Sequence, residues 1–112
     1  MKDEVFNRVK KFVTKQAAVY ENEVTDDASL ENDLGVYGDD AIEFTVAFGK
    51  EFNVDVSRFM AADYFRGEGG DFLGSFGQLF TNERKGQRKD LKVKHLTKAV
   101  LAGSLDEEVI NS

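Results

Sequence analysis

Three carboxylates at the start of a predicted helix are the residues of this sequence best placed to do chemistry. Asp39 and Asp40 follow Gly38 in the run GDDAIEF, and a third acid, Glu43, comes one helical turn later. Neighbouring carboxylates can act as general acid and base. At a helix N-terminus, however, the helix dipole and solvent keep carboxylates ionised, whereas a general acid must hold a proton. The position therefore favours helix capping and an anionic docking surface over catalysis.

The twelve residues from Asp33 to Phe44 have one feature of a calcium-binding loop, its central glycine. Gly38 occupies the sixth place, where such a loop turns sharply. The third, fifth and twelfth places must supply carboxylate or amide oxygens, and they hold Gly35, Tyr37 and Phe44. The pattern therefore does not predict a calcium site.

The glycines between residues 67 and 77 and the single histidine complete the search for reactive groups. No G-K-[ST] follows these glycines and no predicted strand leads into a helix there, so a phosphate-binding loop is not predicted. His95 is the only histidine, and the chain has no cysteine. A zinc site or a nucleophile–base pair needs a second partner. We therefore expect His95 at the surface or boundary of its helix, with no catalytic residue and no metal site.

Hydrophobic periodicity predicts three longer helices and one short one, and hence an all-α fold. The longer helices are expected over residues 3–19, 39–52 and 93–103, where apolar residues recur at three- and four-residue steps. A short helix is expected over residues 58–66, with Ser57 as its N-cap. The predicted inward-facing residues are Val5, Phe6, Val9, Phe12, Val13 and Ala17, then Ala41, Ile42, Phe44, Val46, Phe48 and Phe52, and finally Val93, Leu96, Ala99 and Val100.

Segments between and after these helices carry further expectations. Residues 67–90 combine five glycines with several large apolar residues, so we expect an insertion that folds back on the helical domain, or a two-stranded hairpin. Leu30 and Leu34 are isolated in a polar stretch and are expected to enter the core. Residues 106–112 are expected to be a frayed tail.

Length and composition indicate one domain. The chain has 112 residues, so residues 1–112 are taken as a single domain. No apolar run approaches the roughly 20 residues that a membrane-spanning helix needs. The N-terminal sequence MKDEVFNRVK has charges where a signal peptide would be apolar. We therefore expect a cytoplasmic protein with no membrane partner.

The net charge of −6 divides into a central acidic block between two basic ones. Residues 1–16 contain five basic and two acidic residues, residues 21–55 contain eleven acids and one base, and residues 83–98 contain seven bases and two acids. The acidic block can attract a basic partner, or the basic helices can neutralise it internally, and both readings stay open. The basic stretch lacks interleaved aromatic residues, so no nucleic-acid partner is expected.

The stretch from residue 30 to residue 52 resembles the acyl carrier proteins. Their signature, D-L-G-x-D-S-L-x-x-V-E, is matched at its start by the D-L-G at residues 33–35 and at its end by Ile42 and Glu43. The run FGKEFNVDV at residues 48–56 resembles the family's E-E-F-x-x-x-I helix end. The chain is thus similar to an uncharacterised bacterial family of acyl-carrier-like domains. The resemblance implies a bundle of three longer helices and one short helix, with the insertion before the last helix.

The serine that carries the 4′-phosphopantetheine arm in that family has no counterpart here. Gly38 stands at the serine position, Tyr37 at that of the preceding aspartate and Asp39 at that of the following leucine. Glycine has no hydroxyl, so the phosphodiester to the arm cannot form there. Ser75, in the run GSF, has a flexible glycine neighbour but lacks the flanking aspartate and leucine.

We therefore predict a non-enzymatic interaction module without a cofactor. As the acidic second helix does in the resembling family, this helix would dock a basic patch on a protein partner through Tyr37, Asp39, Asp40 and Glu43. One alternative is an acyl carrier protein of fatty acid, lipid or polyketide-type synthesis that bears 4′-phosphopantetheine on an atypical serine such as Ser75. Another is a regulator that mimics a carrier. No oligomeric state is predicted.

Overall fold

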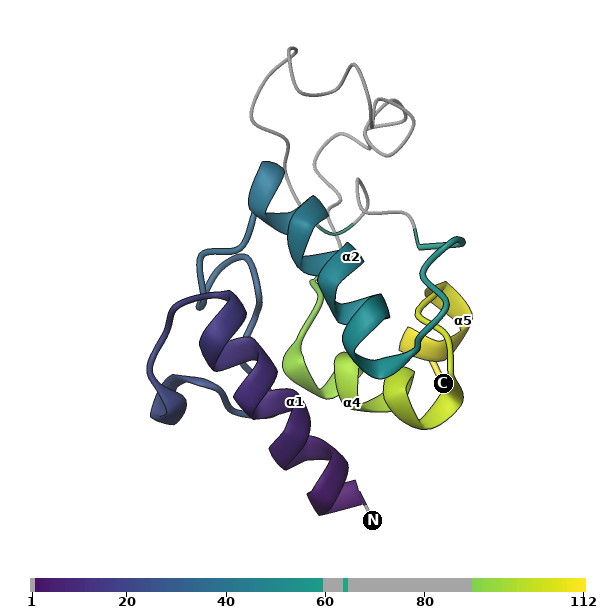
Figure 1. Cartoon of the computed structure of the whole chain (residues 1–112), viewed down its shortest axis with the longest axis horizontal. Helices are drawn as coiled ribbons and strands as arrows, with labels where there is room; N and C mark the ends of the chain where they lie inside the picture. The colour runs from purple at the N-terminus through teal and green to yellow at the C-terminus, as the bar shows by residue number, and fades with distance from the viewer. Residues whose placement is uncertain (1, 60–63, 65–89) are drawn as a thin grey trace.

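The computed structural model of the chain describes residues 2–59, 64 and 90–112 (Figure 1). These residues form four α-helices and one 3₁₀-helix and no strand, which confirms the all-α prediction for this part of the chain. The helices are α1 (Lys2–Gln16), η1 (Glu21–Glu23), α2 (Asp39–Phe52), α4 (Val93–Ala102) and α5 (Glu107–Ile110). The predicted short helix and the predicted insertion, with Ser75, lie outside the described residues except at 58, 59, 64 and 90.

Helix α1 ends three residues before the predicted end, at Gln16 rather than residue 19. Ala18 adopts a φ of +57°, which leaves the right-handed helical region. The Ala17 N–H still donates to the Val13 carbonyl at 2.8 Å, and the Val19 N–H reaches back to the Thr14 carbonyl at 3.2 Å. The apolar spacing continues beyond the point where the backbone turns, so it overestimates the helix.

Helix α2 has the predicted bounds. It begins after Gly38 and ends at Asn53, whose backbone is left-handed with φ 55° and ψ 49°. The Asn53 N–H donates a hydrogen bond to the Gly49 carbonyl and so closes the last turn of the helix. The prediction that Val46 faces inward is wrong, because its side chain is 43% exposed. Val46 is two residues from both Phe44 and Phe48, and about 200° of helical rotation turns it to the opposite side.

Aromatic side chains join α1 to α2. The two helices run antiparallel, as Figure 1 shows, and α1 also lies against α4. The Phe12 ring of α1 lies 5.4 Å from Phe44, 6.0 Å from Phe48 and 5.6 Å from Phe52, measured between ring centroids. Val9, on the same helix as Phe12, is fully buried. Edge-to-face packing of this kind adds to the free energy of burial and fixes how the two helices align.

The connector before α2 is tied to the chain just before α4. Leu30 and Leu34 are buried, as predicted. The Leu30 N–H donates to the Leu91 carbonyl at 2.9 Å, and the Ser29 hydroxyl donates to Asp90 Oδ1 at 2.5 Å. These bonds hold two segments that are about 60 residues apart in sequence.

Residues 106–112 are not a frayed tail, so that prediction is wrong. Asp106 Oδ1 accepts a hydrogen bond from the Val109 N–H at 3.0 Å and caps α5. Ile110 is buried at 6% exposure. Just before, the Leu105 N–H donates to the Asp55 carbonyl at 2.9 Å, which anchors this segment beside the end of α2. A side-chain cap and an apolar anchor together order the C-terminal turn.

Candidate functional site

The backbone at Gly38 has a conformation that glycine alone adopts readily. Its φ is 60° and its ψ is −135°, where a Cβ atom would meet the neighbouring peptide groups. The Gly38 carbonyl accepts hydrogen bonds from the N–H groups of Ala41, at 3.1 Å, and Ile42, at 3.4 Å. The residue is buried at the start of α2. The position predicted to lack a modifiable hydroxyl is therefore also one that the fold reserves for glycine.

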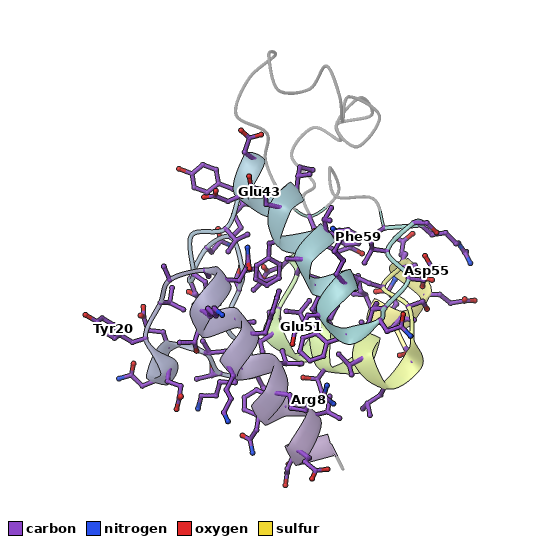
Figure 2. All side chains as sticks on the ribbon, viewed as in Figure 1. Arg8, Tyr20, Glu43, Glu51, Asp55 and Phe59 are labelled. Atoms are coloured by element: carbon purple, nitrogen blue, oxygen red, sulfur yellow. The ribbon has the colours of Figure 1, made fainter. Side chains whose placement is uncertain are left out.

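Asp39, Asp40 and Glu43 are exposed to solvent, and we call these three residues the acidic surface. Figure 2 shows Glu43 near the start of α2. Within the part of the chain that the structure describes, none of the three lies at ion-pair distance from a basic side chain. Tyr37, just ahead of them, is 37% exposed. The structure thus brings together at one end of α2 the residues that the sequence proposed for docking.

An open groove of about 590 Å³ adjoins the acidic surface. Its lining residues are Gln16, Asp39, Ile42, Glu43, Val46, Ala47 and Lys50. Val46 contributes exposed apolar surface and Ile42 is buried at 4% exposure, so carboxylates stand beside apolar side chains. The groove was not predicted from the sequence, because Val46 was expected to face the core. The two-residue offset of Val46 from Phe44 and Phe48 was the signal that could have revealed it.

A second, smaller groove of about 280 Å³ lies between α1 and the end of α2. It is lined by Arg8, Lys11, Phe12, Lys15, Glu51 and Phe52. The Arg8 guanidinium carbon lies 5.4 Å from the centroid of the Phe52 ring, a cation–π arrangement. Figure 2 labels Arg8 on α1 and Glu51 on α2. We call Arg8, Lys11 and Lys15, all three exposed, the basic surface.

His95 serves as a helix cap. It is half-buried, and its Nδ1 accepts a hydrogen bond from the Lys92 N–H at 2.9 Å at the start of α4. Burial lowers the pKa of His95, and the positive charges of Lys98, Lys94 and Lys92 act in the same direction. A neutral imidazole is required here because a protonated ring has no acceptor nitrogen. The half-buried position of His95 agrees with the expectation that it lies at the surface or boundary of its helix.

The described residues contain neither a metal-binding cluster nor a membrane-spanning helix. Among residues 2–59, 64 and 90–112, no group of three or more His, Cys, Asp or Glu side chains is arranged to hold a metal ion. In the same residues, no helix has the length and apolar character needed to cross a membrane.

Comparison with known proteins adds a family match. Residues 1–105 match the model of a family described as "Protein of unknown function (DUF1493)". No solved structure was found that matches the chain. The matched residues include α1, α2 and α4, and therefore both grooves and the acidic surface.

Proposed function

The chain belongs to the DUF1493 family, and we propose that it is a non-enzymatic, acyl-carrier-like interaction module. In this proposal α2 docks a basic surface of a protein partner, and Gly38 bears no phosphopantetheine arm. One observation carries the proposal. The acidic surface is solvent-exposed directly beside a residue that has no hydroxyl and whose backbone favours glycine.

The exposed carboxylates suit recognition better than catalysis. Asp39 and Asp40 occupy the first turn of α2, where the positive end of the helix dipole stabilises their negative charge. An acid catalyst needs a group that keeps its proton until the reaction, in a site closed to water. The groove beside them is open to solvent, with Lys50 at its rim. Charge steering of a protein partner requires only exposed charges of one sign.

The groove indicates what such a partner would present. Charges bring partners together and orient them, but exposed ion pairs add little affinity. Val46, which is 43% exposed, supplies apolar surface in the same groove as Asp39 and Glu43. The proposed partner therefore carries lysine or arginine residues beside an apolar side chain, on a helix or loop that fits an open groove.

The absence of an arm can be tested by mass. The chain is co-expressed with a phosphopantetheinyl transferase and its intact mass is measured. We expect the mass of the unmodified sequence. A gain that corresponds to one phosphopantetheine, mapped to Ser75 or another serine by peptide fragmentation, would overturn the proposal in favour of an atypical carrier.

The docking surface can be tested by charge reversal. Proteins recovered with the native chain from its host are compared with those recovered with Asp39→Lys/Glu43→Lys. We expect the specific partner to be lost at moderate salt, because like charges then face each other. Glu21→Lys/Asp26→Lys, two exposed acids away from the groove, makes the same change in net charge and should retain the partner. Equal recovery with both double variants would place the docking surface elsewhere.

A further inference from the structure

We propose that a second copy of this chain is a partner of the acidic surface, bound through its basic surface in a two-fold dimer. This inference rests on the proposed docking role of α2 and gives it a specific occupant. The chain carries both halves of the interaction. Arg8, Lys11 and Lys15 are exposed on α1, and Asp39 and Glu43 are exposed on α2.

The two grooves adjoin each other along α2 and at the end of α1. Ala47 lines the larger groove, and Glu51, one turn later on the same face of α2, lines the smaller one. On α1, the adjacent residues Lys15 and Gln16 line the smaller and the larger groove respectively. The grooves are therefore adjacent, and we call the line along which they meet, between α1 and α2, the seam.

The antiparallel arrangement sets which charges lie at the same level along the seam. The C-terminal turn of α1 lies beside the first turns of α2, since Gln16 and Glu43 line one groove. Arg8, further back on α1, lies beside Phe52 at the other end of α2. In the proposed dimer the bases of α1 and the acids of α2 form one face, with Lys15 near the level of Glu43.

A two-fold axis parallel to the two helices makes this face complementary to itself. It places α1 of each copy over α2 of the other and preserves the level along the seam. Lys15 of one copy then meets Glu43 of its partner, and the same contact occurs twice, as an isologous interface requires. A two-fold axis across the helices would instead place α1 on α1, with like charges opposed.

Apolar side chains in the same face complete the interface. Val46 is 43% exposed, and Phe12 and Phe52, which are partly buried, line the smaller groove. Lys50 opposes the match, because it is a basic residue that lines the larger groove beside the acidic surface. Because exposed ion pairs are weak and are screened by salt, the dimer should form at high protein concentration and dissociate at high ionic strength.

The dimer has a consequence for docking. Each copy covers the acidic surface of the other, so a foreign basic partner must displace the second copy before it can bind α2. A basic protein partner should therefore convert the dimer to a one-to-one complex.

Sedimentation velocity of the full chain tests the dimer, over protein concentrations from about 5 μM to about 1 mM. We expect the native chain to shift towards the dimer mass in low salt and to return to the monomer in about 1 M salt. Glu43→Lys alone and Lys15→Glu alone should each raise the concentration needed for association at least about tenfold. An equimolar mixture of the two variants should associate again, because each contact then joins opposite charges. Arg58→Glu, an exposed base outside both grooves, should associate like the native chain.

Three outcomes would overturn the dimer: a native chain that stays monomeric in low salt, association that both single reversals leave intact, or a mixture that fails to associate. Helical circular dichroism of each variant shows that loss of association does not reflect unfolding. The proposed function is judged separately. Lys15→Glu leaves the acidic surface unchanged and should still retain a basic protein partner, so a monomeric native chain that retains this partner refutes only the dimer.

Discussion

Replacement of Gly38 by serine should destabilise the fold rather than restore a carrier. The backbone at position 38 has φ 60° and ψ −135°. A residue with a Cβ atom is strained in this conformation, at a cost on the order of 1–3 kcal/mol. A serine N-cap recovers about 1 kcal/mol in other helices, but only when its backbone is extended, which this one is not. We therefore expect the free energy of unfolding to fall by about 1–3 kcal/mol.

Denaturant unfolding of Gly38→Ser and Gly38→Ala measures this effect. Alanine introduces the same Cβ atom without a hydroxyl, so the two variants should lose similar stability. A loss of 1 kcal/mol in a domain of this length lowers the melting temperature by roughly 4 °C. Ala102→Ser, on the exposed side of α4 with ordinary helical backbone, serves as a control for the added hydroxyl and should change stability by less than about 0.7 kcal/mol.

A serine variant at least as stable as the native chain would refute the backbone argument. It would show that the start of α2 accepts a side chain at position 38 and that the backbone there does not require glycine. The variant should also remain unmodified by a phosphopantetheinyl transferase, because Tyr37 and Asp39 still flank it in place of aspartate and leucine.

Three further predictions follow from single contacts. Burial lowers the pKa of His95 in the folded chain below 6.5, so the unfolded chain binds more protons, and stability should fall as the pH drops through 6.5 and level off below the folded pKa. In denaturant unfolding at a series of pH values, His95→Gln, which keeps an acceptor for the Lys92 N–H, should lose this pH dependence, and an unchanged dependence would contradict the argument. Thr97 is 2% exposed and its hydroxyl has no hydrogen-bond partner among the described residues. In denaturant unfolding, Thr97→Val should therefore leave the free energy of unfolding unchanged or raise it by about 1 kcal/mol, and a clear loss would show that the hydroxyl is hydrogen-bonded. Asp106→Ala removes the cap of α5 and should lower stability by about 1 kcal/mol in thermal unfolding, whereas Asp106→Asn should retain most of it, and equal losses would argue against capping.

The helix bounds that the sequence predicted well are those with a local cause. Asn53 adopts the left-handed conformation that ends α2, and Gly103, with φ 87°, ends α4 one residue before the predicted end. Both residue types tolerate this conformation better than others, so the signal is present in the sequence itself. The end of α1 was missed because Ala18, which has no such preference, makes the same turn.

The features that the sequence did not predict depend on contacts between distant residues. The C-terminal turn looked like a free tail because the burial of Ile110 and the anchoring of Leu105 by Asp55 arise only in the folded chain. Likewise, the groove at Val46 depends on Gln16, at the end of α1, coming beside the outer face of α2. The exposure of the acidic surface was predicted correctly, while its docking role stays a prediction.

Native mass spectrometry of the complex recovered with this chain would test two claims together: that the chain carries no phosphopantetheine arm, and that the partner binds at the acidic surface. We expect an unmodified 12.5 kDa chain bound to a protein with a basic patch, and no such complex with Asp39→Lys/Glu43→Lys. A bound chain that carries a phosphopantetheine arm, or a complex that persists with the charge-reversed α2, would contradict recognition without an arm.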